Sequence, residues 1–403
     1  MRPILTMNKD TTILSPVQKG VVGVQFMFVA FGSTVLVPLL VHLDPATALF
    51  TAGIGTLIFH LVTKGIVPIF LGSSFAFIAP ILKSTELYGL PGTMSGIAAV
   101  GLVYFLMSFL VKKFGIRFIN VLFPPVVIGP VIMLIGLSLS PAAVNMAKEN
   151  WLLALISLTT SIVFSLYAKG FMKLVSIVMG VVVGYVVAVI LGAVDFTNVA
   201  NASWISMPQF VKPSFSWEAI LFMLPVAIAP VIEHIGDIYA INGVTGKNFV
   251  EKPGLHRTML GDGLACVLAG FMGGPPVTTY AEVTGAISIT KVKDPVVIRI
   301  AAVTCILFSV LGKMSALLKS IPNAVIGGIM LLLFGSIAAI GVNTLINHKI
   351  NMSDTRNMVI VSIMLIVGIG GAAVEFGDFT MSGIGLAAII GVLLNIVLPK
   401  KAS

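Results

Sequence analysis

The amino-acid sequence predicts an all-α polytopic membrane protein. Of its 403 residues, 58% are hydrophobic and only 10% are charged, whereas soluble domains carry about 25% charged residues. Apolar runs of about 18 to 23 residues, each long enough to cross a bilayer as a helix, recur along the whole chain. A chain of this composition has too few polar residues to face water on all sides, so membrane lipid is its expected surrounding.

The apolar runs predict about fourteen transmembrane spans. In chain order they cover residues 20–40, 46–63, 68–82, 92–111, 122–140, 151–168, 173–193, 217–241, 258–273, 276–290, 296–314, 322–341, 357–374 and 381–398. Seven spans precede the longest polar connection, residues 195–216, and seven follow it. Because an odd number of spans reverses the direction of the chain, the second set must insert upside down relative to the first. The sequence therefore predicts two inverted repeats, residues 1–194 and 217–403.

The third and tenth spans are interrupted by turn-forming residues. The third contains Pro68, Gly72 and Pro80, and the tenth follows Gly273, Gly274, Pro275 and Pro276. Adjacent prolines remove backbone donors, so a regular helix cannot pass through them, and the residues that follow suit short extended segments. The two spans also share a pattern, "SSFAF" at 73–77 and "TTYAE" at 278–282. Since non-helical backbone inside a membrane persists only beside protein or a water-filled cavity, these breaks predict a binding site near the midplane.

The basic residues lie mostly on one side of this arrangement. If the N-terminus is cytoplasmic, 19 of the 24 lysines and arginines are cytoplasmic and 5 are not, namely Lys83, Lys148, Lys212, Lys313 and Lys319. This asymmetry is typical of an inner-membrane protein, here with both termini in the cytoplasm. The net charge of +9 is therefore an orientation signal, and no nucleic-acid partner is expected.

The remaining motifs argue against an enzyme or an ATP-driven pump. No phosphate-binding loop G-x-x-x-x-G-K-[ST] and no zinc motif H-E-x-x-H occurs in the sequence. The polar N-terminal stretch 1–20 does not resemble a cleaved signal. Cys266 and Cys305 fall inside predicted spans, where single cysteines are expected to pack rather than to form a disulfide. We expect no cofactor and no metal site.

Three acids lie inside apolar spans, where a charged residue costs roughly 2.5–3.5 kcal/mol. Glu233 and Asp237 are in the eighth span, four residues apart and so on one helix face, and Glu282 is in the tenth. No lysine or arginine lies in these spans to pair with them, so the acids predict a functional site. The alternative is that they are protonated and hold the bundle together by hydrogen bonds. We interpret His234 as packing or polar support, and Asp262 as a helix-start residue near the cytoplasmic face.

Several segments follow the pattern of a known family. They are "FGSTVLVP" (31–38), "LGSSFAFI" (71–78), "LFPPVVIGP" (122–130), "PGLHRTMLGDGL" (253–264) and "GGPPVTTYAE" (273–282), followed by the signature-like run "EVTGAISITK" (282–291). Through them nearly all of the chain resembles the nucleobase–ascorbate transporter family, and within it the bacterial uracil/proton symporters. The resemblance implies a core of spans 1–4 and 8–11 that holds substrate and a gate of spans 5–7 and 12–14. It also implies a homodimer formed through the gate spans.

The resemblance also implies roles for individual residues. By position, Glu233 and Glu282 would be the carboxylates that hold the base. Backbone groups around Phe75 and Ala281 would contact the base, and Tyr280 and Phe75 would lie beside its ring.

Three positions depart from the family pattern. Asp237 falls where uracil symporters often carry a histidine linked to proton coupling, Val283 replaces the signature asparagine, and Phe26 stands where Gln-His is common. Asp237 resembles the xanthine branch, whereas Glu282 favours uracil, because purine-selecting members usually carry glutamine there. The resemblance therefore implies proton-coupled uptake of uracil with Asp237 as the proton carrier, and the alternative is a purine or xanthine symporter.

The chemistry of uracil suits these residue types. Carboxylates accept hydrogen bonds from its two ring N–H groups, and amides at the ends of broken helices donate to its two carbonyls. Two other functions fit less well. An anion transporter of the same fold would need a cation in the membrane, which the sequence lacks. An intramembrane aspartyl protease using Asp237 and Asp262 would need Tyr-Asp and Gly-x-Gly-Asp motifs, and neither occurs.

Overall fold

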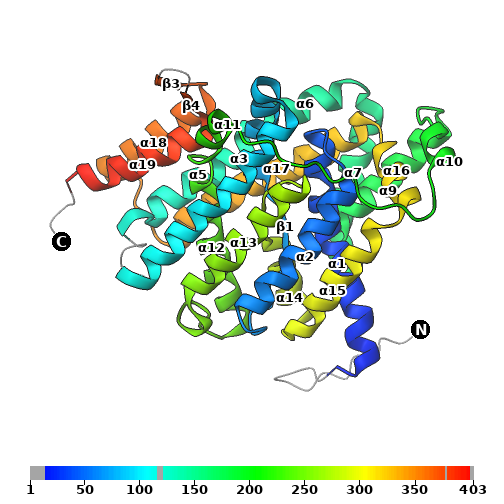
Figure 1. Cartoon of the computed structure of the whole chain (residues 1–403), viewed down its shortest axis with the longest axis horizontal. Helices are drawn as coiled ribbons and strands as arrows, with labels where there is room; N and C mark the ends of the chain where they lie inside the picture. The colour runs from blue at the N-terminus through cyan, green and yellow to red at the C-terminus, as the bar shows by residue number, and fades with distance from the viewer. Residues whose placement is uncertain (1–13, 116–120, 377–378, 400–403) are drawn as a thin grey trace.

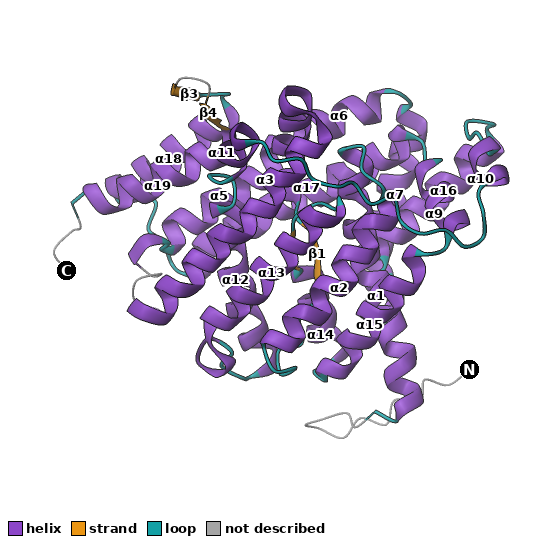
Figure 2. Cartoon of the chain, in the orientation of Figure 1, coloured by secondary structure: helices purple, strands orange, loops and turns teal. Residues whose placement is uncertain are grey.

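The computed structural model describes residues 14–115, 121–376 and 379–399 as an assembly of helices with two pairs of short strands (Figure 2). The first half contains α1 (Pro16–Leu40), α2 (Pro45–Val62), β1 (Leu71–Ser73), the 3₁₀ turn η1 (Phe75–Phe77), α3 (Ile78–Phe114), α5 (Pro125–Ser138), α6 (Ser140–Lys148), α7 (Trp151–Tyr167), α8 (Phe171–Leu174), α9 (Ser176–Ile190) and α10 (Thr197–Asn201). Both termini lie outside the described residues. So do five of the basic residues counted for the orientation of the chain, namely Arg2, Lys9, Arg117, Lys400 and Lys401.

The second half begins after the connection 195–216. It contains α11 (Trp217–Met223), α12 (Ile228–Thr245), the π turn η2 (Val250–Gly254), α13 (Leu255–Met272), β2 (Val277–Thr279), α14 (Ala281–Thr290), α15 (Pro295–Ser309), α16 (Gly312–Lys319), α17 (Asn323–Asn347), α18 (Thr355–Ile369), β3 (Ala373–Phe376), β4 (Phe379–Ser382) and α19 (Gly383–Val397).

The helices have the length and composition of membrane spans. In the described residues, five helical stretches are long and apolar enough to cross a bilayer, namely Pro16–Leu40, Pro45–Val62, Phe75–Phe114, Pro125–Lys148 and Asn323–Asn347. The bent pair α11 and α12 forms a sixth, and α7, α9, α15, α18 and α19 are shorter apolar helices. The prediction of a mainly helical membrane protein is confirmed, and the count of fourteen spans stays a prediction.

Helix boundaries differ from the predicted spans where local backbone chemistry intervenes. The span predicted at 217–241 is two helices that meet at 42°, because Pro225 between them has no N–H to continue the ladder. Within α3, Gly89 has a φ of +71° and Pro91 follows it, so this element bends between the predicted third and fourth spans. The antiparallel hairpin β3–β4 was not predicted.

The helices pack in two groups that are discontinuous in sequence. In the first group, α13 packs against α2 and α3, α15 packs against α1 and α2, and α11 packs against α3. In the second group, α17 packs against α5, α6 and α7, α7 packs against α9, and α18 packs against α5 and α19. Figure 1 shows α18 and α19 at one end of the molecule and α9 and α10 at the other. Helix α12 lies between the groups, since it contacts α13 and α14 as well as α5 and α19.

The connection 195–216 runs across the bundle from α10 to α11 (Figure 1). It is held in place by a hydrogen bond to the carboxylate of Asp44. Asp44 caps α2 by accepting from the Thr47 N–H at 3.2 Å. It also accepts from the Gln209 N–H at 3.1 Å and the Ser315 hydroxyl at 3.1 Å, and it pairs with Lys319 at 2.8 Å. Burial raises the pKa of Asp44, but the bonds from Lys319, Gln209 and Thr47 outweigh burial and hold that pKa below its ordinary value.

We expect Asp44→Asn to destabilise the protein at neutral pH by about 1.5–3 kcal/mol, the range for hydrogen bonds to a charged group. Asparagine keeps the helix cap but loses the charge that attracts Lys319. Because the folded pKa of Asp44 is lowered, its contribution is full above the ordinary pKa of about 3.9 and is lost as the pH falls through the folded value. Thermal unfolding in detergent should therefore separate wild type from variant at pH ~7 and bring them together in strong acid. An equal separation at both pH values would contradict this account.

Candidate functional site

A cavity of about 990 Å³ opens between the two helix groups. Its wall is built from α12, from β1 and η1, from β2 and the start of α14, and from α5, α7, α9 and α17. All six residues proposed from the sequence line it, namely Phe75, Glu233, Asp237, Tyr280, Ala281 and Glu282. Val283 and Phe26, two of the departures from the family pattern, are both buried but do not line it.

The strands β1 and β2 bring the two halves of the chain together at the cavity. They pair antiparallel, with Leu71 opposite Thr279 and Ser73 opposite Val277. The pairing continues at both ends, where the Ser74 N–H donates to Pro276 O at 2.8 Å and the Tyr280 N–H donates to Phe70 O at 3.1 Å. Each strand leads directly into a helix, η1–α3 after β1 and α14 after β2. The first amides of these helices have no partner within the helix, so they offer donors beside the cavity.

The three acids reach the cavity from two elements. Glu282 lies in the first turn of α14 and accepts from the Ser33 hydroxyl at 2.9 Å. Asp237 on α12 is only 8% exposed and accepts from the Thr279 hydroxyl at 2.6 Å. Glu233 lies one turn before Asp237, and no side chain among the described residues hydrogen-bonds to it. Its carboxylate is therefore available to a ligand.

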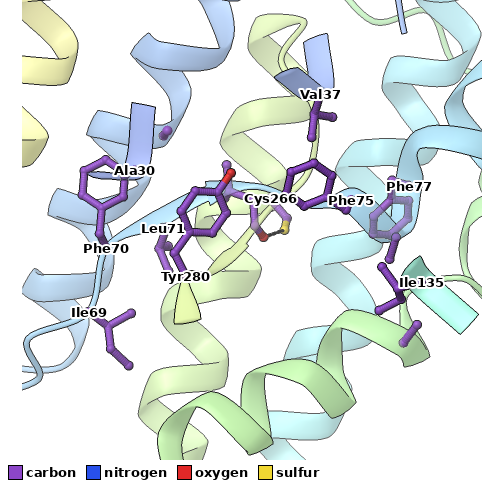
Figure 3. Packing of buried hydrophobic residues seen from close by; sticks show 14 of the residues in the cluster. Ala30, Val37, Ile69, Phe70, Leu71, Phe75, Phe77, Ile135, Cys266 and Tyr280 are labelled. Carbon is purple, nitrogen blue, oxygen red and sulfur yellow. Dashed lines mark hydrogen bonds between the residues drawn. The ribbon is translucent and has the colours of Figure 1, made fainter. Parts of the chain in front are cut away.

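Two aromatic side chains are fixed beside these acids, and Figure 3 shows both near the strand pair. The Tyr280 hydroxyl donates to Ser73 O at 3.0 Å. Its ring lies against Gly72, where a Cβ would collide with it, so glycine is required at this point of β1. Phe75 packs edge-on against Phe334 of α17, with ring centres 6.0 Å apart. Both rings line the cavity next to the strand ends.

The helix α13 holds the strand β2 from behind. The Cys266 thiol donates to Val277 O at 3.0 Å, the dashed line in Figure 3. Both Cys266 and Cys305 are buried and free. Among the described residues, no group of three His, Cys, Asp or Glu side chains is arranged to hold a metal ion.

The interpretation of Asp262 as a helix-start residue is wrong. The helix α13 begins seven residues earlier, at Leu255, so Asp262 lies in its interior with its side chain fully buried. Its Oδ2 is 2.8 Å from His234 Nδ1, and His234 Nε2 is 2.9 Å from the Thr258 hydroxyl. His234 therefore gives polar support, as predicted, and its partner was missed. The sequence does contain one indication of this pair, because a histidine and an aspartate lie in neighbouring apolar spans.

Apolar helices around a cavity lined by three acids are typical of a membrane transport protein. Residues 17–376 match the model of the permease family Xan_ur_permease. The chain belongs to this family, the nucleobase–ascorbate transporters, and it is a transporter rather than an enzyme.

Two relatives and one solved structure illustrate the likeness. The "Probable uracil permease" of Pasteurella multocida (strain Pm70) is 50% identical over 392 residues, which cover 95% of this chain and 94% of that protein. The "Uracil permease" of Bacillus caldolyticus is 44% identical, with 94% of this chain and 91% of that protein covered. The transmembrane domain of the cyanobacterial bicarbonate transporter BicA has the same fold. It matches with a TM-score of 0.65 at 13% identity, covering 96% of this chain and 99% of that chain.

Proposed function

We propose that this permease takes up uracil together with a proton across the cell inner membrane by alternating access. The observation that carries the proposal is the meeting of Glu233, Asp237 and Glu282 in one cavity, beside the paired ends of β1 and β2. The uracil permease names of close relatives support the choice of substrate.

Uracil would be held by acceptors from one side and donors from the other. Glu233 and Glu282 accept from its ring N–H groups, and amides near Phe75 and Ala281 donate to its carbonyls. The rings of Phe75 and Tyr280 lie beside the base. Uracil has about eight heavy atoms, and with at most about 1.5 kcal/mol from each atom, micromolar affinity is attainable.

The proton supplies the driving force for this uptake. Uracil is neutral, so the membrane potential does not act on it directly, whereas one proton moving through 100 mV provides about 2.3 kcal/mol, roughly 50-fold accumulation. Asp237 would carry that proton because it lies one helical turn from Glu233 at the same cavity. Two acids this close in a medium of low dielectric resist ionising together.

The proposed architecture is fourteen spans in two inverted repeats with both termini cytoplasmic. The core would be spans 1–4 and 8–11 and the gate spans 5–7 and 12–14, in agreement with the two helix groups and with α12 between them. The cavity wall extends along the last turns of α17 to Asn343, Asn347 and His348, on the predicted cytoplasmic side, so this conformation would face inward. The gate helices would form a homodimer interface.

Glu282→Gln should weaken uracil binding by about 10- to 100-fold, because an amide replaces a carboxylate as the acceptor of a ring N–H. The substitution keeps an oxygen that can accept from the Ser33 hydroxyl, so the start of α14 should stay in place. Calorimetry with uracil and with xanthine would measure the loss and any shift toward the purine. Unchanged uracil affinity would remove Glu282 from the binding site.

The substrate is tested by binding to the purified, unmodified protein. Uracil should bind with micromolar affinity, and xanthine should compete weakly. Tighter binding of xanthine would favour the purine alternative, which Asp237 suggests. Competition by chloride or sulfate would instead favour an anion transporter.

A further inference from the structure

A buried pair behind the cavity has no role in the function proposed so far. It consists of His234 on α12 and Asp262 on α13, whose side chains are both fully buried. Among the described residues, His60 and His234 are the buried basic side chains, and no lysine or arginine is buried. His234 follows the cavity residue Glu233 directly along α12.

The hydrogen bonds of this pair fix how many protons it carries. The Thr258 hydroxyl donates to Leu255 O at 2.9 Å, so it is arranged to accept from His234 Nε2 at 2.9 Å. His234 Nδ1 and Asp262 Oδ2, 2.8 Å apart, must then share a second proton, since two bare acceptors at that distance would repel each other. The pair is neutral overall, whichever of the two groups holds that proton.

The second carboxylate oxygen of Asp262 has no hydrogen bond of ordinary geometry, although the Thr279 backbone N–H lies toward this carboxylate. Asp262 Oδ1 is buried without a hydrogen-bond partner among the described residues, and so are the hydroxyls of Tyr104 and Thr278. The Tyr104 hydroxyl faces both Thr278 and the Asp262 charge, although none of the three atoms completes a hydrogen bond of ordinary geometry. Buried polar atoms without partners are costly. A proton on Oδ1 would make Asp262 a donor to this group, and Thr278 itself lines the cavity.

The charges around the pair connect it to the cavity acids. Glu233 interacts electrostatically with Asp262 as well as with Asp237 and Glu282. Asp237 of α12, Tyr104 of α3 and Cys266 of α13 also interact electrostatically with Asp262. The helices α5 and α19, which also pack against α12, carry no titratable side chain. A change of charge at Asp262 therefore acts electrostatically on the cavity acids Glu233 and Asp237.

We propose that the His234–Asp262 pair is a second proton-binding site of the transporter, coupled to the cavity acids across β2. The proposal rests on the proposed function, because it assigns a role in proton-coupled uptake. When a cavity acid gives up its proton, the O–H bond there breaks and an O–H bond forms at Asp262 Oδ1. The acid is left as a carboxylate, and the pair changes from neutral to a charge of one. His234 and Asp262 do not touch the substrate, and they act by stabilising the ionised cavity acid.

The test counts protons. Uracil binding to the purified full-length protein is measured by calorimetry in two buffers of different ionisation enthalpy, which gives the protons exchanged per uracil bound. In Asp262→Asn, and in the double variant His234→Gln with Asp262→Asn, the proton count should change by about 0.5 to 1 while the Kd for uracil stays within about 5-fold. The matched control is Asp195→Asn, an exposed acid in the connection 195–216, and its count should equal that of wild type. A wild-type count in both pair variants would overturn the proposal.

A second variant covers the case in which the pair variants do not fold. Tyr104→Phe removes only the hydroxyl that faces the Asp262 carboxylate. It should slow uptake driven by a pH gradient by about 10-fold and leave uracil counterflow unchanged, because only proton delivery is impaired. Uptake at the wild-type rate would contradict the proposal. Failure of the wild-type protein to bind uracil would instead refute the proposed function.

Discussion

Replacing Glu233 by alanine is expected to abolish uracil transport while the protein still accumulates in the membrane. Glu233 lines the cavity and accepts no side-chain hydrogen bond from the described residues, so its oxygens are free to receive the N–H of a base. Without them, a ring N–H of bound uracil is left unpaired in a closed site, and such losses reduce activity by about 100-fold or more. Removing an acid from an apolar helix favours membrane insertion.

The measurement is uracil uptake normalised to the amount of protein in the membrane. Glu251→Ala is the matched control, because Glu251 is an exposed glutamate in the turn after α12 and its loss should leave uptake unchanged. If Glu233→Ala fails to accumulate while Glu251→Ala does, then Glu233 holds the bundle together and the alternative of structural acids is correct.

Asp237→Asn is expected to retain uracil binding and counterflow but to lose accumulation driven by a pH gradient. The amide mimics a permanently protonated carboxyl group, and its oxygen can still accept from the Thr279 hydroxyl, now 2.6 Å from Asp237 Oδ2. The cavity should therefore keep its shape while the proton can no longer leave. Accumulation should fall from roughly 50-fold, for one proton at 100 mV, to about 1.

Both activities are measured in the same vesicles, so that counterflow reports intact binding and movement. Loss of counterflow as well would mean that Asp237 holds the substrate. If the variant still concentrates uracil under a proton gradient, the coupling proton is carried elsewhere, and Glu233 becomes the first candidate.

The sequence predicts those parts of the fold that depend on local chemistry. Apolar runs indicate the helices, and three acids within them indicate Glu233, Asp237 and Glu282 at one site, because a charge in such a run is costly unless it has a use. The prolines before Val277 and around Leu71 indicate where helix cannot continue. The structure has the strands β1 and β2 at those positions, paired with each other.

The features that were missed depend on contacts between distant segments. The role of Asp262 follows from the rotation of α13 relative to α12, which brings its side chain to His234. The spacing of residues within either helix cannot predict how the two helices are rotated relative to each other. The bend between α11 and α12 had a local signal in Pro225, but a single proline inside an apolar run is also compatible with a kinked, continuous helix. The hairpin β3–β4 pairs two four-residue strands, which are too short for a clear periodic pattern.

The most direct test of the proposed function is uptake of radiolabelled uracil into proteoliposomes containing only this protein. Uptake is followed with and without an inward proton gradient, and with unlabelled xanthine as competitor. Proton-coupled uracil transport predicts accumulation above the external concentration only when the gradient is present, its collapse by a protonophore, and little inhibition by xanthine. Uracil accumulation that is the same with and without the proton gradient would contradict the proposed function. So would uptake that is suppressed by xanthine at a concentration equal to that of uracil.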